Sequence, residues 1–188
     1  MKKQIAIFAS GRGSNADTLM RYFEHHESIM VQKIVCNNAA AGVVDIAQKH
    51  GVNCDIINKA QFADETYMQT ILNKIDLIVL AGFLWLIPPF LIYQFENRII
   101  NIHPSLLPKY GGKGMYGVHV HNAVLANKET ETGITIHLVN EEFDKGEILA
   151  QYRVSLTKDD TLDTVQQKIA TLEKANFAQV IADFLNKK

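Results

Sequence analysis

Asn101 and His103 are the residues whose types and spacing best suit chemistry. They lie in a β-branched apolar run, which is typical of a buried strand. Side chains two positions apart on a strand point to the same face, so an amide and an imidazole stand side by side. Pro104 lacks an N–H group and ends the strand at His103. Ligands bind at the carboxyl ends of strands in open α/β sheets, so the pair predicts a site. The structural alternative is a buried polar pair bonded to loop backbone.

A glycine-rich turn is the second candidate functional element of the sequence. Gly11-Arg-Gly-Ser-Asn-Ala16 follows a strand-like run and opens a helical pattern. Free backbone N–H groups at a helix N-terminus, together with the Ser14 and Asn15 side chains, suit a phosphate. The turn also fits a dinucleotide fingerprint, which requires a ribose-binding acid about twenty residues later. The chain has Cys36-Asn-Asn38 there, so the pattern favours a monophosphate over NAD. The structural alternative is a turn that only caps a helix.

Three acidic residues lie in the segment Asn140-Glu-Glu-Phe-Asp-Lys-Gly146, the predicted turn of a hairpin. Such a turn is ordinarily a solvated loop. If it folds over the end of the strand that carries His103, one of its acids orients the imidazole. The spacing alone does not identify which acid this is.

Four histidines invite comparison with a metal site, namely His103, His119, His121 and His137. No pair of them has the i, i+4 spacing of a helical zinc site, and no cysteine joins them. His119 and His121 diverge if they lie on a helix. Ser105 lacks the Gly-x-Ser-x-Gly turn of a nucleophilic serine. The sequence therefore predicts neither a metal site nor a covalent nucleophile.

Strand-like and helical patterns alternate along the chain. Strands are expected at residues 5–9, 31–36, 52–57, 76–81, 99–103, 132–139 and 148–156. Helices are expected after residue 15 and at residues 43–50, 62–74, 118–127 and 162–185, with a glycine-rich loop at residues 109–117. This order predicts an α/β fold with a Rossmann-like, doubly wound, mostly parallel sheet and helices on both faces. A C-terminal antiparallel hairpin and a long helix extend it.

Composition limits the classes of function. The chain has 188 residues, 47% hydrophobic and 21% charged, which suits a single domain over residues 1–188. A formal net charge of −1 gives no field that attracts nucleic acid or an anionic membrane. No apolar run approaches the roughly 18 residues of a membrane span, and the first apolar run is too short for a signal peptide. Cys36 and Cys54 are expected to be reduced core residues, so we expect a cytoplasmic protein.

The string Asn101-Ile-His-Pro-Ser-Leu-Leu-Pro108, the glycine-rich loop after it and an aspartate about forty residues later resemble the formyltransferase family that uses 10-formyltetrahydrofolate. Ser10-Gly-Arg-Gly-Ser-Asn15 and Leu80-Ala-Gly-Phe83 narrow the resemblance to members that act on phosphoribosylglycinamide in purine biosynthesis. The resemblance covers nearly the whole chain. It implies an enzyme that transfers a formyl group from this cosubstrate to the amine of 5-phosphoribosylglycinamide. The transfer is direct, through a tetrahedral intermediate, and requires no metal.

The resemblance also implies residue roles. Asn101, His103 and Asp144 match the catalytic residues, with Asn101 and protonated His103 stabilising the anionic oxygen and Asp144 favouring the charged imidazole. Residues that match the substrate-binding positions are Gly13, Ser14, Asn15 and Glu173. Residues that match the folate-binding positions are Leu84, Trp85, Leu86, Ile87, Val139 and Asn140, together with Asn101 and Asp144.

On the same basis, residues 1–103 form a phosphate-binding half and residues 104–188 a folate-binding half. The expected partners are small-molecule substrates, with no nucleic acid and no membrane, and a weak homodimer is allowed.

The chain departs from the family pattern in three places. Trp85 stands where relatives often have arginine, and residues 61–67 include no basic side chain for the glutamate tail of the folate. The loop at residues 111–117 is a few residues longer than usual.

Two rival functions are compatible with the sequence. One is a formyltransferase for a sugar nucleotide or aminoacyl-tRNA, which generally carries a second domain. The other is a non-enzymatic nucleotide-binding module, in which Asn101, His103 and Asp144 need not converge.

Overall fold

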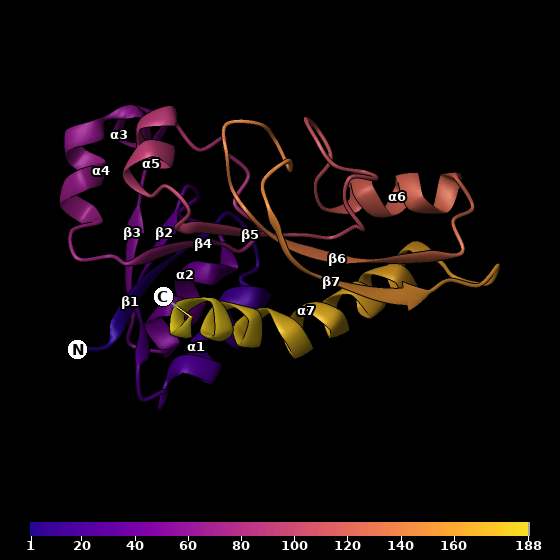
Figure 1. Cartoon of the computed structure of the whole chain (residues 1–188), viewed down its shortest axis with the longest axis horizontal. Coiled ribbons are helices and arrows are strands. Elements are labelled where there is room, and N and C mark those ends of the chain that lie inside the picture. The colour runs from indigo at the N-terminus through magenta and orange to yellow at the C-terminus, as the bar shows by residue number, and fades with distance from the viewer. Residues whose placement is uncertain (188) are drawn as a thin grey trace.

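A computed structural model describes residues 1–187. Within these residues the strands form one sheet in the order β3-β2-β1-β4-β5-β6-β7 (Figure 1). Strands β1 to β5 pair in parallel, whereas β6 pairs antiparallel with both β5 and β7. The strand bounds are β1 Lys3–Ala9, β2 Ile29–Cys36, β3 Asn53–Ile56, β4 Leu77–Leu80, β5 Ile99–His103, β6 Glu131–Leu138 and β7 Ile148–Ser155. The predicted mostly parallel sheet and its antiparallel hairpin are confirmed.

Helices cover both faces of this sheet. The helix bounds are α1 Ser14–Phe23, α2 Gly42–Lys49, α3 Lys59–Ala63, α4 Glu65–Ile71, α5 Pro89–Gln94, α6 Val118–Ala126 and α7 Leu162–Asn186. One buried cluster joins α1, α2 and α7 to Ile5 and Ile7 of β1. The other joins α3, α4 and α5 to Ala6 and Phe8, which point to the opposite face of the same strand. All four residues of β4 are buried, as the doubly wound interpretation requires.

The helices differ from the prediction in two places. The single helix expected at residues 62–74 is two helices, α3 and α4. Asp64 separates them because its backbone is extended and its side chain accepts a hydrogen bond from the N–H of Tyr67, which starts a new helix. Asn58 and Gln61 form a capping box that starts α3 earlier than expected. Helix α5 was not predicted, although Pro89 occupies the first helical position that proline favours.

The long helix α7 brings the end of the chain back to its beginning. Thr161 and Thr164 form its capping box, and Lys168 contacts Asp160 just before the helix. In Figure 1 the yellow C-terminal end of α7 lies beside α1, and the two helices are in contact. Tyr22 of α1 donates to Gln179 of α7 at 2.7 Å. Residues near the two ends of the sequence therefore share one face of the sheet.

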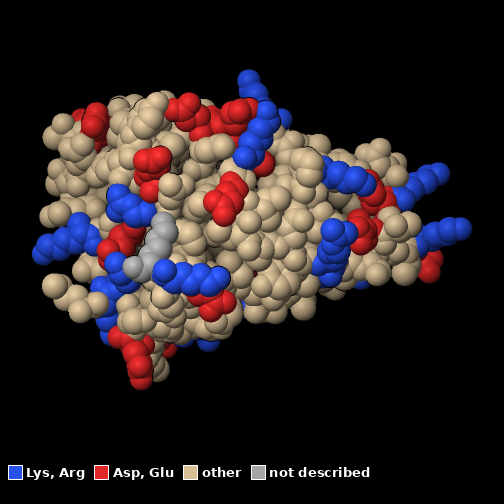
Figure 2. All heavy atoms as spheres, viewed as in Figure 1, with Lys and Arg blue, Asp and Glu red and all other residues tan. Residues whose placement is uncertain are grey.

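Charged side chains give the surface no dominant sign. Acidic and basic groups are interspersed around the face seen in Figure 2, in agreement with the formal net charge of −1. None of the described helices is long and apolar enough to cross a membrane.

Candidate active site

The carboxyl ends of β1, β4 and β5 open into one cavity of about 520 Å³. The order of the sheet changes direction between β1 and β4, and ligands of open α/β sheets bind at such a switch point. Every residue that the sequence predicts for the site lines this cavity. These residues are Gly13, Ser14, Asn15, Leu84, Trp85, Leu86, Ile87, Asn101, His103, Val139, Asn140, Asp144 and Glu173.

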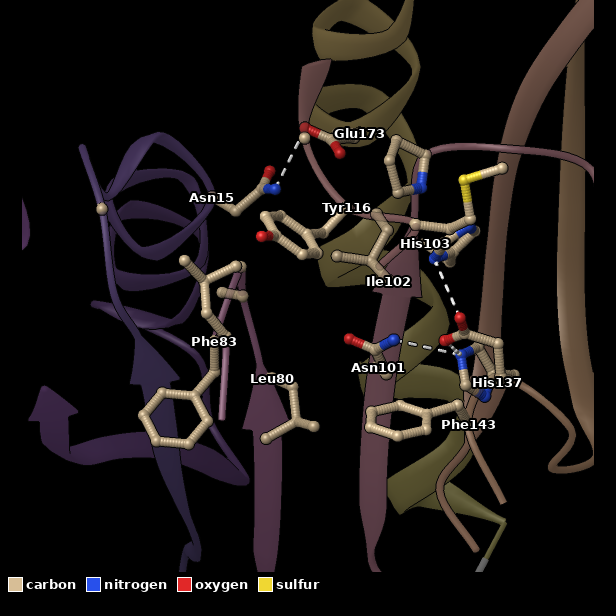
Figure 3. A pocket seen from close by; sticks show the side chains of 18 of the residues that line it. Asn15, Leu80, Phe83, Asn101, Ile102, His103, Tyr116, His137, Phe143 and Glu173 are labelled. Atoms are coloured by element: carbon tan, nitrogen blue, oxygen red, sulfur yellow. Dashed lines mark hydrogen bonds and ion pairs between the residues drawn. The ribbon is translucent and has the colours of Figure 1, made fainter. Parts of the chain in front are cut away.

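Asn101 is oriented by a residue of the neighbouring strand. The antiparallel register of β5 and β6 places Asn101 opposite His137. The Asn101 side-chain nitrogen donates to Nε2 of His137 at 3.1 Å (Figure 3). Nδ1 of His137 donates to the Leu138 carbonyl at 2.7 Å. His137 therefore accepts through Nε2 and holds the amide in one orientation. The second N–H of the amide is left for a ligand.

His103 ends β5 and is held by the loop that follows. Its Nε2 lies 2.8 Å from the Tyr110 carbonyl, which is only an acceptor, so Nε2 carries the proton. The loop is fixed from within, because the buried Ser105 hydroxyl donates to the Lys109 carbonyl at 2.6 Å. Thr135 donates to the Ser105 carbonyl at 2.7 Å. Ser105 is thus a structural residue, and Nδ1 is the nitrogen of His103 that remains for chemistry.

Asp144 is the acid of the hairpin turn that reaches the histidine. One of its oxygens, Oδ2, lies 3.6 Å from Nδ1 of His103, and Oδ1 lies 3.6 Å from Nε2 of His137. The N–H of Gly112 donates to Oδ2 at 2.8 Å. A Cβ atom at the neighbouring Gly111 would lie 3.2 Å from Cβ of Asp144 and 2.5 Å from Cδ2 of Leu107, so the loop passes close to Asp144 at this point. The turn therefore folds over the strand end, and the acid that meets His103 is Asp144.

The electrostatics of this group correct one prediction. Burial lowers the pKa of His103, and the charge of Asp144 and the Tyr110 carbonyl act in the opposite direction without overcoming it. The sign predicted for the Asp144 effect is confirmed, but the expected net preference for imidazolium was wrong. Burial disfavours ionisation of Asp144, yet the charge that His103 carries when protonated and the Gly112 N–H lower the pKa of Asp144. At neutral pH the site therefore pairs an ionised Asp144 with a neutral His103.

The predicted phosphate turn lies across the cavity from these groups. Gly13 immediately precedes α1 with φ of 80°, and no side chain caps the N–H groups of the first turn of the helix. A Cβ atom at Gly13 would lie 2.8 Å from Cα of Val43, so the close contact of the turn with α2 requires glycine. The N–H of Val43 donates to the Gly11 carbonyl at 3.1 Å and fixes the turn. The free N–H groups suit an anion.

Asn15 and Glu173 meet although 158 residues separate them. The Asn15 side-chain nitrogen donates to Oε2 of Glu173 at 3.0 Å, and Figure 3 shows the two side chains pointing toward each other. Burial raises the pKa of Glu173, and the bond from Asn15 opposes the rise. Helix α7 thereby adds a carboxyl group to the phosphate end of the cavity.

The segment after β4 forms an apolar wall. Leu84 and Leu86 are exposed at 58% and 55%, whereas Ile87 is 4% exposed and anchors the segment in the core. The N–H of Leu84 donates to the Ser10 hydroxyl at 3.0 Å, which ties this wall to the phosphate turn. Trp85 packs on the Phe62 ring, with centroids 5.5 Å apart. Exposed leucines and a supported indole suit a flat, largely apolar ligand.

A family model described as formyl transferase matches residues 3–181. The chain belongs to the formyl transferase family.

Within this family, the chain is similar to proteins named phosphoribosylglycinamide formyltransferase. The chloroplastic phosphoribosylglycinamide formyltransferase of Arabidopsis thaliana is 36% identical over 194 residues, covering 96% of this chain but only 64% of the relative. The chain thus spans less than two thirds of the length of this relative. Phosphoribosylglycinamide formyltransferase of Bacillus subtilis (strain 168) is 34% identical over 190 residues, covering 97% of this chain and 95% of the relative. The crystal structure of phosphoribosylglycinamide formyltransferase from Bacillus halodurans has a TM-score of 0.87 at 32% identity, covering 98% and 96% of the two chains.

The sequence analysis did not assign some of the residues that line the cavity to the site. His137 was considered only as a metal ligand, and its contact with Asn101 follows from a strand register that no local pattern specifies. Phe143 lies beside the predicted Asp144 and lines the cavity at 44% exposure. Phe143 follows two exposed acids in the turn, so its sequence context is that of an ordinary turn residue. Among the described residues no group of three or more histidines, cysteines or acids is arranged to hold a metal ion.

Proposed function

We propose that the protein transfers a formyl group from 10-formyltetrahydrofolate to the amine of 5-phosphoribosylglycinamide, a step of purine biosynthesis. The observation that carries the proposal is the convergence of Asn101, His103 and Asp144 at one side of the cavity. The other side of the cavity has a turn whose free N–H groups suit an anion. The names of the plant and Bacillus relatives support the same pair of substrates. A non-enzymatic nucleotide-binding module does not require these three side chains to converge.

The acceptor substrate binds at the N-terminus of α1. Its phosphate accepts hydrogen bonds from the N–H groups of Ser14 and Asn15, where the helix dipole favours negative charge. Gly13 supports this assignment because its missing side chain brings the turn against α2. Glu173 lies beside Asn15 and faces the sugar or glycinamide part of the acceptor.

The formyl donor binds on the opposite wall. Leu84, Trp85, Leu86 and Ile87 present apolar and aromatic surface to its rings, and Val139, Asn140 and Asp144 border the same space from the hairpin turn. Trp85 rests on the Phe62 ring, so contact with the donor is by packing where relatives often place an arginine. The donor supplies the formyl carbon that the acceptor amine attacks.

Asn101 and His103 perform the transfer. The free N–H of Asn101 donates to the formyl oxygen as negative charge develops there, and one such donor contributes roughly 2.7–4 kcal/mol in comparable enzymes. His103 begins neutral, with its Nε2 proton bonded to the Tyr110 carbonyl. Its Nδ1 takes the proton that the attacking amine loses, directly or through a water molecule. The imidazolium so formed is stabilised by Asp144 at 3.6 Å and returns the proton to the leaving nitrogen.

Each part of the chain contributes to both ends of the cavity. Residues 1–103 supply the phosphate turn and also the apolar wall at residues 84–87 on the donor side, and residues 104–188 supply the hairpin turn that borders the donor. The proposed contacts also cross this division, because Glu173 joins Asn15. All proposed site residues come from one chain, which is compatible with a monomer or a weak homodimer.

The absorbance change that follows loss of the formyl group from the donor tests the function. We expect a rate that requires phosphoribosylglycinamide and falls about 10²- to 10³-fold in Asn101→Ala. Phosphoribosylglycinamide raises the melting temperature of the wild-type protein because it binds only the native state. A rate that is the same without acceptor, or stabilisation by NAD in place of phosphoribosylglycinamide, contradicts the proposal.

A further inference from the structure

One buried histidine of the cavity has no hydrogen-bond partner among the described residues. His121 lies on α6 and is 5% exposed. Its Nδ1 is buried without a hydrogen-bond partner, and no hydrogen bond within the described residues reaches its Nε2. Buried imidazole nitrogens are nearly always paired, because an unpaired one has lost its water without compensation. A histidine left in this state inside a cavity indicates a bond that a ligand completes.

The position of His121 identifies which part of the cavity it faces. It lines the same cavity as His103, and the two imidazoles are close enough that the charge of one acts on the other. Helix α6 packs against α7, which carries Glu173 at the acceptor end. His119, two positions earlier, is exposed and points away from this cavity, as expected for residues 200° apart around a helix. His121 therefore borders the acceptor side of the cavity next to the reacting group.

The charge state of His121 suits a neutral ligand group. Burial lowers its pKa, and the neighbouring His103 adds to this effect. A neutral imidazole offers one N–H donor and one acceptor nitrogen. An amide group offers the complementary acceptor and donor, whereas a phosphate or carboxylate offers only acceptors.

We propose that His121 hydrogen-bonds the glycinamide amide of the acceptor substrate and so positions the amine beside His103. The inference rests on the proposed function. The attacking amine must lie within reach of His103, and the amide of glycinamide is separated from this amine by one carbon. A side chain next to His103 on the acceptor side therefore meets the amide before any other polar group of the substrate. Fixing the amide limits the rotation of the amine and favours the geometry of attack.

His121→Leu tests the proposal, because leucine preserves apolar volume and removes both nitrogens. We expect the KM for phosphoribosylglycinamide to rise about tenfold or more, with the KM for 10-formyltetrahydrofolate within about twofold of wild type. The melting temperature without ligand should stay level or rise, since no internal bond is lost. The rise in melting temperature that the acceptor causes should shrink. The matched control, His119→Leu, alters an exposed histidine of the same helix and should change neither KM.

Unchanged acceptor KM and unchanged acceptor stabilisation in His121→Leu overturn the proposal, as does an equal rise in both KM values. If the variant does not fold, the side-chain ¹⁵N resonances of wild-type His121 provide the test. Acceptor alone should shift them, and resonances that do not move would overturn the role. A wild-type protein that neither binds phosphoribosylglycinamide nor transfers a formyl group refutes the proposed function itself, whatever His121 does.

Discussion

Replacing Asp144 with asparagine preserves the shape of the side chain and removes its charge. The Asn oxygen still accepts the Gly112 N–H, so the turn should keep its position. In the wild-type protein Oδ2 lies 3.6 Å from Nδ1 of His103. Two unit charges at this distance attract by about 4.6 kcal/mol at an effective dielectric constant of about 20. This attraction exists only while His103 is protonated, which in our mechanism is after the amine has given up its proton.

The loss of this attraction sets the expected rate. About 1.4 kcal/mol corresponds to a factor of ten, so 4.6 kcal/mol sets a ceiling near 10³. Solvent and the amide dipole replace part of the attraction, and we expect kcat/KM of Asp144→Asn to fall about 10²- to 10³-fold. The pKa of His103 is already lowered by burial, and Asp144 opposes that lowering. Removing the charge lowers it further, so the acidic limb of the pH profile should move to lower pH.

The assay is kcat/KM against pH, with the His103 titration followed by NMR. Glu141→Gln is the matched control, because Glu141 is an exposed acid of the same turn that accepts a hydrogen bond from the Tyr93 hydroxyl and does not line the cavity. It should leave both the rate and the titration as in wild type. Asp144→Asn with a wild-type rate, or with an acidic limb that moves to higher pH, refutes the role assigned to Asp144.

Three further predictions concern binding, reactivity and stability. Gly13→Ala should raise the KM for phosphoribosylglycinamide at least about tenfold, since a Cβ would lie 2.8 Å from Cα of Val43; an unchanged KM would show that the turn does not hold the phosphate. Cys54 should resist iodoacetamide at neutral pH in the folded protein and react quickly in urea, because burial raises its pKa to about 11; rapid labelling of the folded protein would contradict this. Thr161→Ala should lower the melting temperature by about 2–4 °C through loss of about 1 kcal/mol from the α7 cap, measured by calorimetry; no change would mean that the cap is not stabilising.

The order of strands and helices could be predicted because most signals are local. The apolar run at β4 and the strand that ends at His103, just before Pro104, are visible in a few residues. The break between α3 and α4 was missed because the side chain of Asp64 overrides a continuous apolar stripe, and only its cap bond reveals this. Helix α5 is six residues long and too short to show a period.

The candidate site could be predicted only in part, because several of its contacts join segments that are far apart in the sequence. Asn101 and His103 follow from strand alternation, whereas the choice of Asp144 over Glu141 depends on how the hairpin turn folds back, which spacing does not determine. The partner of Asn101 follows from the register between β5 and β6. The protonation of His103 was predicted with the wrong net sign because desolvation depends on burial, which a sequence does not measure.

The central claim is that this cavity moves a formyl group from the folate to the acceptor amine. The most direct measurement uses a donor labelled with ¹³C in its formyl group and follows the label by NMR. The account predicts that the label appears in the formamide of the acceptor product, in equal amount to the deformylated folate. Label that accumulates as formate, or that leaves the donor at the same rate without phosphoribosylglycinamide, would contradict it.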